Sequence, residues 1–406
     1  MKKGTFDFEK FSKEVQEGLY SNKPLLGQGG LFTPLIKQFL ESALEGEMEA
    51  HLKQEDPLTK GSRNRRNGKS RKQVQSALGA FELLSPRDRD GSFEPEIVAK
   101  RQVKITSDID QKIIGLYGLG MSYSDIKSHL KEMYDFDISE GTISSITDQI
   151  LPSIKEWQNR PLESIYPVIW LDAMFYKVRE DGVVKTKAVY SVLGVTLTGS
   201  KEVLGVYLGD SESASFWRGV LTNLQERGIE DVFIACIDNL RGFGDAIDDY
   251  FPKTEVQLCL VHQMRNSLKF VPDKDMREVA KDLKLIYRAT TESDGKQALE
   301  DAEAKWGKKY PAIFKSWNNN WDRLANIYKY RPAFKRLIYT TNPIESYHRM
   351  IRKVTKTKGS FNSEKAIIKL VYLAVQNAQT KWDGQIFGWS SIQQDLHIIF
   401  KDRLNN

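Results

Sequence analysis

The amino-acid sequence predicts a multidomain α/β protein, and three observations lead to that prediction. Apolar residues recur at helical spacing within residues 31–52 and 106–150. From about residue 165 the pattern changes to three strands with short turns, followed by helix, strand, helix and strand. Residues 263–335 are again helical in pattern and rich in lysine and tryptophan. A chain of 406 residues has room for two or three such domains.

The composition argues against several classes of protein. No apolar stretch approaches the roughly 18 residues that cross a bilayer, so no membrane span is expected. The start, MKKGTFDFEK, lacks the apolar segment of a signal peptide. The two cysteines, Cys236 and Cys259, argue against a disulfide scaffold and fit a reducing cytoplasm. A net charge of +6 is only mildly basic, so the positions of the charges matter more than their sum.

Residues 1–100 are expected to form an N-terminal region for DNA binding or oligomerisation. Within it, residues 31–52 predict an amphipathic helix with apolar positions at Phe32, Ile36, Phe39 and Ala43. This helix packs either on its own domain or on a second copy of the chain. The alternation in VQSALGAFELL, which follows shortly afterwards, predicts a hairpin.

A basic run, KGSRNRRNGKSRK, occupies residues 60–72 and contains no acidic residue. Glycine, serine and asparagine between the charges indicate a loop or arm. A solvated linker is one interpretation. The favoured one is an arm on a DNA phosphate backbone, because each neutralised phosphate releases counterions. Its candidate DNA-binding residues are Arg65, Arg66 and Lys69.

Residues 101–160 are expected to contain three short helices. Ser122 and Asp125 have the spacing of a capping box at the second helix, and Ser139 starts the third. The spacing is typical of a helix-turn-helix, whose last helix enters a major groove, although any small three-helix bundle has a similar pattern. The third helix offers Thr142 and Gln149 rather than arginines. Recognition of a DNA sequence by this helix would therefore depend on neutral polar groups or on DNA shape.

The elements within residues 161–262 have the order of a ribonuclease-H-like fold. In such a sheet the first strand and the strand after the crossover helix are neighbours. Residues 336–406 are expected to complete this core. They begin with a strand-like segment, LIYTT, and end in one long helix.

Three carboxylates lie at the ends of predicted elements. Asp172 follows the apolar run PVIWL, Asp238 follows FIACI, and Glu345 lies in the first turn of a helix. The fold order would place the two aspartates side by side, and a helix across the sheet could bring the glutamate to them. Taken singly, each has an ordinary explanation as a strand-end aspartate, a turn residue or part of a capping box. Their joint occurrence in this order favours a site.

Crowded carboxylates repel one another unless cations neutralise them. Oxygen-only ligands select hard ions, so the sequence predicts Mg²⁺, with Mn²⁺ as a possible substitute. Two such ions about 3.5–4 Å apart stabilise both the attacking and the leaving oxygens in phosphodiester chemistry. Asp172, Asp238 and Glu345 are therefore predicted to be both catalytic residues and metal ligands.

These residues resemble the bacterial insertion-sequence transposases of the Mutator-like family, which use a DDE catalytic triad. The resemblance covers nearly the whole chain, and its specific blocks include ACIDNLRGF, KSWNNNWDRL and IYTTNPIESYHRMIRKVTKTKGSF. It implies that Asp172, Asp238 and Glu345 are the triad, and that residues 263–335 are an all-helical insertion in the core. Cys259 and His262 match the family's Cys-x-x-His signature. Without a second Cys/His pair for zinc, they are expected to orient the catalytic residues by hydrogen bonding.

The chain departs from the family pattern at four positions, none of which removes a ligand. These are Asn239, Pro343, Tyr347 and His348. We expect His348 to be a surface or packing residue, close enough to the glutamate to touch a DNA phosphate.

Two further groups are candidate DNA contacts. Basic residues recur at helical intervals after Glu345 and would hold the scissile strand: Arg349, Arg352, Lys353 and Lys356. A salt bridge from Glu345 to Arg349 is the alternative. Trp317 and Trp321 either stack on a flipped base or pack in the core, and core packing is favoured for at least one of them.

The resemblance implies a DNA transposase that cleaves at terminal inverted repeats and joins the 3′-hydroxyl ends to target DNA by two-metal-ion chemistry. The alternative is a catalytically inactive, transposase-derived DNA-binding regulator, which the intact triad disfavours, and a nuclease of the same fold is a third possibility. The expected partners are double-stranded DNA and a second copy of the chain, because pairing two DNA ends ordinarily requires two active sites. The expected location is the bacterial cytoplasm, at the nucleoid.

Overall fold

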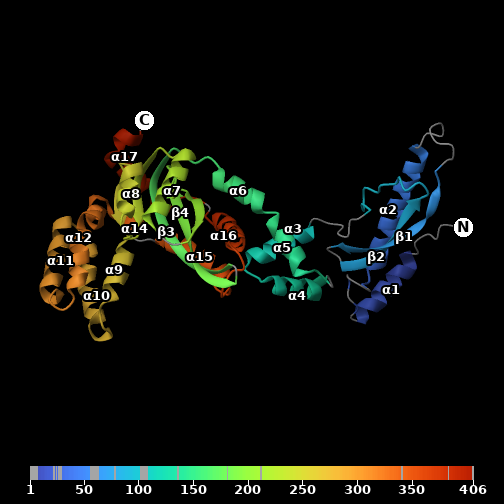
Figure 1. The fold of residues 1–406 in the computed structure, drawn as a ribbon, viewed down its shortest axis with the longest axis horizontal. Coiled ribbons are helices and arrows are strands. Elements are labelled where there is room, and N and C mark those ends of the chain that lie inside the picture. The colour runs from blue at the N-terminus through green and yellow to red at the C-terminus, as the bar shows by residue number, and fades with distance from the viewer. Residues whose placement is uncertain are drawn as a thin grey trace. The chain divides into compact units, whose positions relative to one another are not determined.

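A computed structural model gives the fold (Figure 1), and it describes most of the chain. The described residues are 8–21, 23, 25, 30–54, 64–76, 79–100, 108–134, 137–180, 182–210, 213–339, 342–382 and 384–404. The chain divides into two compact units, Met1–Gln149 and Ile150–Asn406. No helix in the described ranges is long and apolar enough to cross a membrane.

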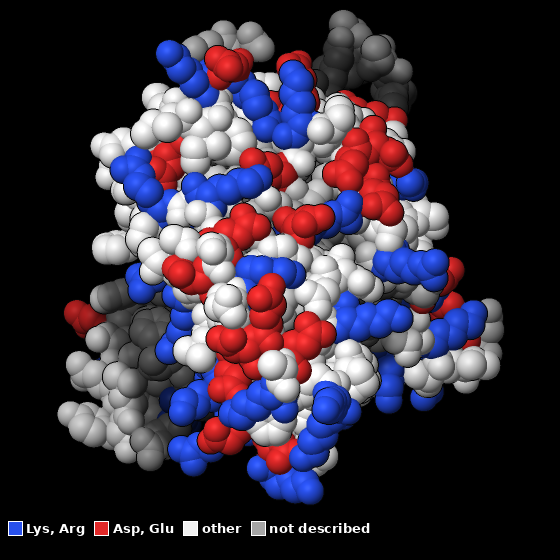
Figure 2. Space-filling model, turned by 90° about the vertical axis from the view of Figure 1, so that its left-hand side faces the viewer, with Lys and Arg blue, Asp and Glu red and all other residues white. Residues whose placement is uncertain are grey.

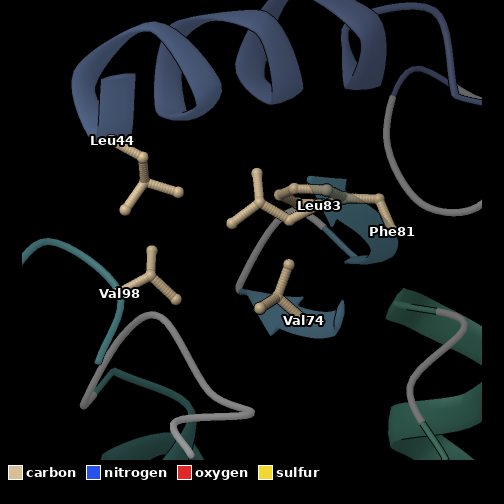
Figure 3. Packing of buried hydrophobic residues seen from close by; sticks show 5 residues of the cluster. All are labelled: Leu44, Val74, Phe81, Leu83 and Val98. Atoms are coloured by element: carbon tan, nitrogen blue, oxygen red, sulfur yellow. The ribbon is translucent and has the colours of Figure 1, made fainter. Parts of the chain in front are cut away.

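The first unit begins with two helices and a hairpin. The bounds are α1 Phe8–Tyr20, α2 Thr33–Gln54, β1 Arg66–Ser76 and β2 Gly79–Asp88. The two strands pair antiparallel, which confirms the predicted hairpin. Apolar residues of α2 and of both strands meet in a small core (Figure 3), and its members are Leu44, Val74, Phe81, Leu83 and Val98.

The buried face of α2 differs from the prediction. Phe39 is 73% exposed, whereas Leu44 and Met48 are fully buried. Ile36 and Leu40 pack partly against the same core, so the buried positions recur every four residues from Ile36. The sequence offers two helical stripes that overlap at Ile36, and the hairpin covers the one that continues through Leu44.

The basic run does not form a loop or arm from Arg66 onwards, because these residues belong to β1. Extended backbone paired with β2 fixes their positions. The earlier members of the run, residues 60–63, lie outside the described residues.

Three short helices follow, as predicted, with bounds α3 Asp108–Gly118, α4 Tyr123–Tyr134 and α5 Glu140–Asp148. Each of them contacts the other two. The Ser122 hydroxyl accepts from the Asp125 backbone N–H at 3.1 Å, while the Asp125 carboxylate accepts from the Ser122 N–H at 3.1 Å. Ser139 caps α5 by accepting from the Thr142 N–H. The third helix is shorter than predicted, since a separate helix, α6 Leu151–Asn159, starts after it.

The second unit is built on a five-stranded sheet of order β5-β4-β3-β6-β7. The bounds are β3 Ile165–Glu180, β4 Val183–Val195, β5 Lys201–Gly209, β6 Asp231–Ile237 and β7 Glu255–Leu258. β3, β4 and β5 are antiparallel, and β6 and β7 run parallel to β3. The predicted neighbours, the first strand and the strand after the crossover helix, are therefore adjacent. Nearly continuous burial along β6 shows that both faces of the sheet are covered.

Helices connect and cover these strands (Figure 1). α7 Ala214–Glu226 joins β5 to β6, and α8 Phe243–Tyr250 joins β6 to β7. A helical stretch then follows, as predicted: α9 Leu260–Leu268, α10 Asp273–Arg288, α11 Glu292–Trp306, α12 Pro311–Asn319, α13 Trp321–Leu324, a 3₁₀ turn Ala325–Lys329 and α14 Pro332–Tyr339. Over the face that contains α10 to α12, acidic and basic side chains are interleaved (Figure 2).

Two predictions about the end of the chain are wrong. Leu337–Tyr339, expected as a strand, form the last turn of α14, and Thr340 and Thr341 lie outside the described residues. The single long helix is four helices, α15 Asn342–Thr355, α16 Glu364–Gln379, α17 Trp389–Ile399 and α18 Lys401–Leu404. Gly388, with φ +77°, adopts a left-handed conformation immediately before α17 and so separates it from the preceding segment.

Candidate active site

Asp172 and Asp238 lie where two adjacent parallel strands part. β3 pairs with β6 as far as Leu171 opposite Ile237. Asp172 is the next residue of β3, and Asp238 directly follows the last residue of β6. The side chains are restrained locally. The Ala173 N–H donates to the Asp172 carboxylate at 2.8 Å, and the Asn239 N–H donates to the Asp238 carboxylate at 2.7 Å.

Glu345 comes from the first turn of α15, which packs against β3. Ile344, Tyr347 and Ile351 are completely buried and form the packed side of this helix. The Ser191 hydroxyl of β4 donates to the Tyr347 hydroxyl at 3.2 Å and so fixes the helix on the sheet. Glu345 thereby joins both aspartates in the lining of one pocket of about 780 Å³.

Each of the three carboxylates faces a nitrogen-bearing side chain. His262 Nδ1 lies 3.6 Å from the Asp238 carboxylate, and His348 Nδ1 lies 3.5 Å from that of Asp172. The Arg265 guanidinium forms an ion pair with Glu345 at 2.8 Å. Of these three contacts, the one from Arg265 brings a permanent positive charge to the carboxylates.

Cys259 and His262 occupy the first turn of α9. Cys259 is the N-cap, and its sulfur accepts from the His262 N–H at 3.3 Å. This contact caps the start of the helix, and the His262 ring of this first turn faces Asp238. The pair therefore lies beside an aspartate of the pocket. The 3.6 Å separation to Asp238 is longer than a hydrogen bond.

His348 is buried, with only 4% of its surface exposed, so it is a packing residue and does not lie on the surface. Burial of the ring, together with the nearby charges of Arg352 and His262, lowers the pKa of His348 to about 3. The imidazole is consequently neutral at neutral pH, and with its proton on Nδ1 it presents an N–H to Asp172.

The predicted basic face of α15 lines the same pocket as the carboxylates. It consists of Arg349, Arg352, Lys353 and Lys356. Glu345 forms its ion pair with Arg265 of α9, across the pocket. The alternative from the sequence was a salt bridge to Arg349 within α15. The row of cations along this helix would attract a polyanion to the side of the pocket that holds the carboxylates.

The pocket suits a divalent cation in its donor chemistry. Its carboxylates supply oxygen ligands, as hard ions prefer, and they come from three separate elements of one packed core. Among the residues that the structure describes, no three such side chains already form a closed set around one point. Each of the three carboxylates has its own nitrogen-bearing neighbour instead.

The two candidate tryptophans are not available for base stacking. Trp317 is fully buried and its indole N–H donates to the Ser267 hydroxyl at 2.9 Å. Trp321 is 8% exposed and donates to Glu292 at 3.2 Å. The core-packing alternative is therefore the one that the structure supports for both, and it corrects the DNA-contact assignment.

Two of the three candidate DNA-binding residues of the hairpin have an acidic partner. Arg66 and Lys69 both form ion pairs with Glu45 of α2, at 2.5 and 2.8 Å. Arg65 is exposed. Residues 60–72 contain no acidic residue, but the fold places Glu45 beside two of their cations.

Sequence reasoning missed Arg265 and Phe175. Arg265 lines the pocket one helical turn after His262, and that spacing was a usable signal. Phe175 lines the pocket with 56% of its surface exposed, and nothing in an apolar strand pattern distinguishes it from its buried neighbours.

Comparison with known proteins gives consistent matches along the chain. The family model described as "Transposase, Mutator family" matches residues 9–385. The transposase for insertion sequence element ISRM3 of Rhizobium meliloti is 41% identical over 398 residues, covering 97% of this chain and 99% of the relative. A probable transposase of an ISRM3-like element of Sinorhizobium fredii shares the same identity and coverage. A probable insertion-sequence transposase of Corynebacterium diphtheriae is 40% identical over 301 residues, covering 74% and 88%.

Proposed function

Because the chain belongs to the Mutator family and is an insertion-sequence transposase, we propose that Asp172, Asp238 and Glu345 are its catalytic triad. The observation that carries this proposal is their meeting in one pocket from the end of β6, the adjacent position in β3 and the first turn of α15. The reaction we propose is cleavage at the terminal inverted repeats, followed by joining of the 3′-hydroxyl ends to target DNA.

The three carboxylates would hold Mg²⁺, or Mn²⁺ in its place. When bound, such ions neutralise charge on the phosphodiester and favour loss of a proton from the attacking water or 3′-hydroxyl. Around them, His348 and His262 hold the orientations of Asp172 and Asp238, and Cys259 positions His262 through the start of α9. Arg349, Arg352, Lys353 and Lys356 bind the phosphates of the scissile strand.

The fold proposal is a ribonuclease-H-like core in residues 161–262 and 336–406, interrupted by a helical insertion at 263–335. The strand order β5-β4-β3-β6-β7, with three antiparallel strands followed by two parallel ones, supports it. The run of helices from α9 to α14 between the second and third carboxylates supports the insertion.

The N-terminal unit is proposed to bind DNA. The three mutually packed helices α3 to α5 would act as a helix-turn-helix within residues 101–160, and the basic hairpin of residues 1–100 would contact phosphates. Two copies of the chain are expected on a pair of terminal repeats, in the bacterial cytoplasm at the nucleoid.

One cleavage experiment tests the site. DNA carrying both terminal repeats of the element is incubated with wild-type protein, Glu345→Gln and Asp238→Asn, with Mg²⁺ or with EDTA, and nicks are mapped. We expect nicks at the repeat ends in wild type with Mg²⁺ alone, and DNA binding without nicks in both variants. Glu226→Gln, at the exposed end of α7, is the matched control and should cleave normally.

The outcomes separate the alternatives. Cleavage that persists in Asp238→Asn contradicts the triad. Specific binding without cleavage under any divalent metal identifies the DNA-binding regulator, and cleavage that ignores the repeat ends identifies a nuclease.

A further inference from the structure

Arg265 stands out among the three nitrogen partners of the carboxylates. The other two are histidines, which can be neutral and remain beside a metal ligand. A guanidinium is always positively charged and cannot be deprotonated in a protein. Its ion pair at 2.8 Å therefore places a permanent positive charge against Glu345, the carboxylate that is proposed to bind the metal ion.

The position of Arg265 is set by the same helix that orients His262. The two residues are three positions apart on α9, so they lie on one face of it. One reaches Asp238 at the end of β6 and the other reaches Glu345 on α15. The N-cap contact of Cys259 fixes the start of this helix, and so it helps to position both side chains.

Arg265 is the more accessible member of its pair with Glu345. The Arg265 side chain is 59% exposed and that of Glu345 is 25% exposed. An exposed ion pair of this kind contributes little to folding stability. Arg265 also lines the pocket together with the cationic face of α15, so an entering DNA strand would come within its reach.

Guanidinium binds carboxylate and phosphate by the same two-pronged hydrogen bonding. A phosphate of the DNA backbone can therefore replace Glu345 as the partner of Arg265. Glu345, relieved of the guanidinium, becomes a stronger ligand for a divalent cation, because the competing positive charge has moved away.

We propose that Arg265 exchanges partners during the reaction. In the DNA-free protein it pairs with Glu345. When DNA enters the pocket it moves to a phosphate of the scissile strand and leaves Glu345 to the metal ion. Arg265 is thus a substrate-binding residue that couples DNA entry to metal binding, and this role rests on the proposed function of the pocket.

The test measures metal and DNA binding separately in the full-length protein. Mn²⁺ binding without DNA is followed by electron paramagnetic resonance in wild type, Arg265→Gln and Arg265→Lys. Terminal-repeat DNA binding is measured in EDTA over a range of salt concentrations. The matched control is Lys269→Gln, at the end of the same helix, where the ammonium contacts Asn266 at 2.9 Å.

We expect Arg265→Gln to bind Mn²⁺ at least about fivefold more tightly than wild type, because the competing cation is gone. The same variant should bind DNA more weakly, with the slope of log K against log salt reduced by about 0.9. Arg265→Lys keeps the charge and should retain the wild-type salt slope while losing the two-pronged contact. Lys269→Gln should leave Mn²⁺ binding unchanged.

The proposed exchange of partners is wrong if Arg265→Gln binds Mn²⁺ as wild type does or more weakly. It is also wrong if the salt dependence of DNA binding is unchanged in this variant. Glu345→Gln in the same assay separates this from failure of the proposed function. If Glu345→Gln weakens Mn²⁺ binding and abolishes cleavage while Arg265→Gln binds Mn²⁺ as wild type does, the triad stands and the exchange is wrong. If Glu345→Gln changes neither, the triad assignment fails, and the exchange fails with it.

Discussion

His348 on α15 faces Asp172 on β3, with Nδ1 3.5 Å from the carboxylate. The helix that carries the proposed catalytic glutamate therefore also supplies the partner of the first aspartate. Because the ring is 4% exposed and α15 is anchored on the sheet, this contact fixes two of the three carboxylates relative to one another. Metal-ligating groups commonly depend on such outer contacts for their orientation.

Removal of this contact is expected to impair cleavage more than DNA binding. His348→Gln should lower the rate of strand cleavage at the terminal repeats by about 10–100-fold, the usual effect of losing an outer partner of a metal ligand. DNA affinity in EDTA should remain close to wild type. His397→Gln, an exposed histidine on α17, is the control and should cleave normally. Normal cleavage by His348→Gln would show that Asp172 is held without it.

The same histidine predicts how stability depends on pH. Its pKa is about 3 in the folded protein and about 6.5 in an unfolded chain, so the unfolded state binds the proton more readily. The stabilisation from the neutral ring is fully present above about pH 6.5 and is lost as the pH falls towards 3. In the metal-free protein the free energy of unfolding should fall by up to about 1.4 kcal/mol per pH unit over this window from this group.

Urea unfolding of wild type and His348→Gln at several pH values between 3 and 7.5 isolates this contribution, because the other titrating groups are shared. Arg352 is the neighbouring cation, His262 is the other titratable group nearby, and Asp172 is the acid that faces the ring. The difference in stability between the two proteins should change with pH. A constant difference would mean that His348 has an ordinary pKa in the folded state.

The main parts of the second unit could be predicted because they follow from local patterns. Apolar runs ending in Asp172 and Asp238 mark two strand ends, and the order of elements makes those strands neighbours. The pairing of Arg265 with Glu345 could not be predicted in this way. It joins two helices far apart in the chain, and its distance depends on how both pack on the sheet.

The errors have similar physical causes. Phe39 and Leu44 both fit a helical stripe, and only the hairpin decides which side of α2 is covered. Leu337–Tyr339 is a short apolar run of a kind that suits strand or helix equally, and here the preceding turns of α14 extend through it. The acid-free composition of residues 60–72 could not reveal that Glu45 from α2 lies beside Arg66.

Trp317 is expected to support the folding of the helical stretch from α9 to α14. Trp317→Ala should destabilise the protein by about 3–5 kcal/mol, because it leaves a large cavity and removes the contact to Ser267. Trp317→Phe retains most of the packing and should cost less. Urea denaturation measures both, and terminal-repeat binding by the folded Phe variant is the companion experiment. Wild-type stability combined with lost DNA binding in Trp317→Phe would restore the stacking interpretation.

The hairpin offers a test of DNA binding through Glu45. Lys69 and Arg66 lower the pKa of Glu45 below its usual value, against the opposing effect of burial, so the carboxylate is charged at neutral pH. In the proposed DNA complex, Glu45 would compete with phosphates for both cations. Glu45→Gln should therefore tighten binding to terminal-repeat DNA, and the double change Arg66→Gln/Lys69→Gln should weaken it and reduce the salt slope by up to about 1.8.

These affinities are measured by fluorescence anisotropy from 50 to 300 mM salt, roughly the range in which counterion release dominates. Lys10→Gln is the matched control, because Lys10 is an exposed lysine on α1 that pairs with Glu14. Its salt slope should equal that of wild type. If the double variant also keeps the wild-type slope, the two cations serve only to fasten the hairpin to α2, and the DNA contacts of the N-terminal unit lie elsewhere.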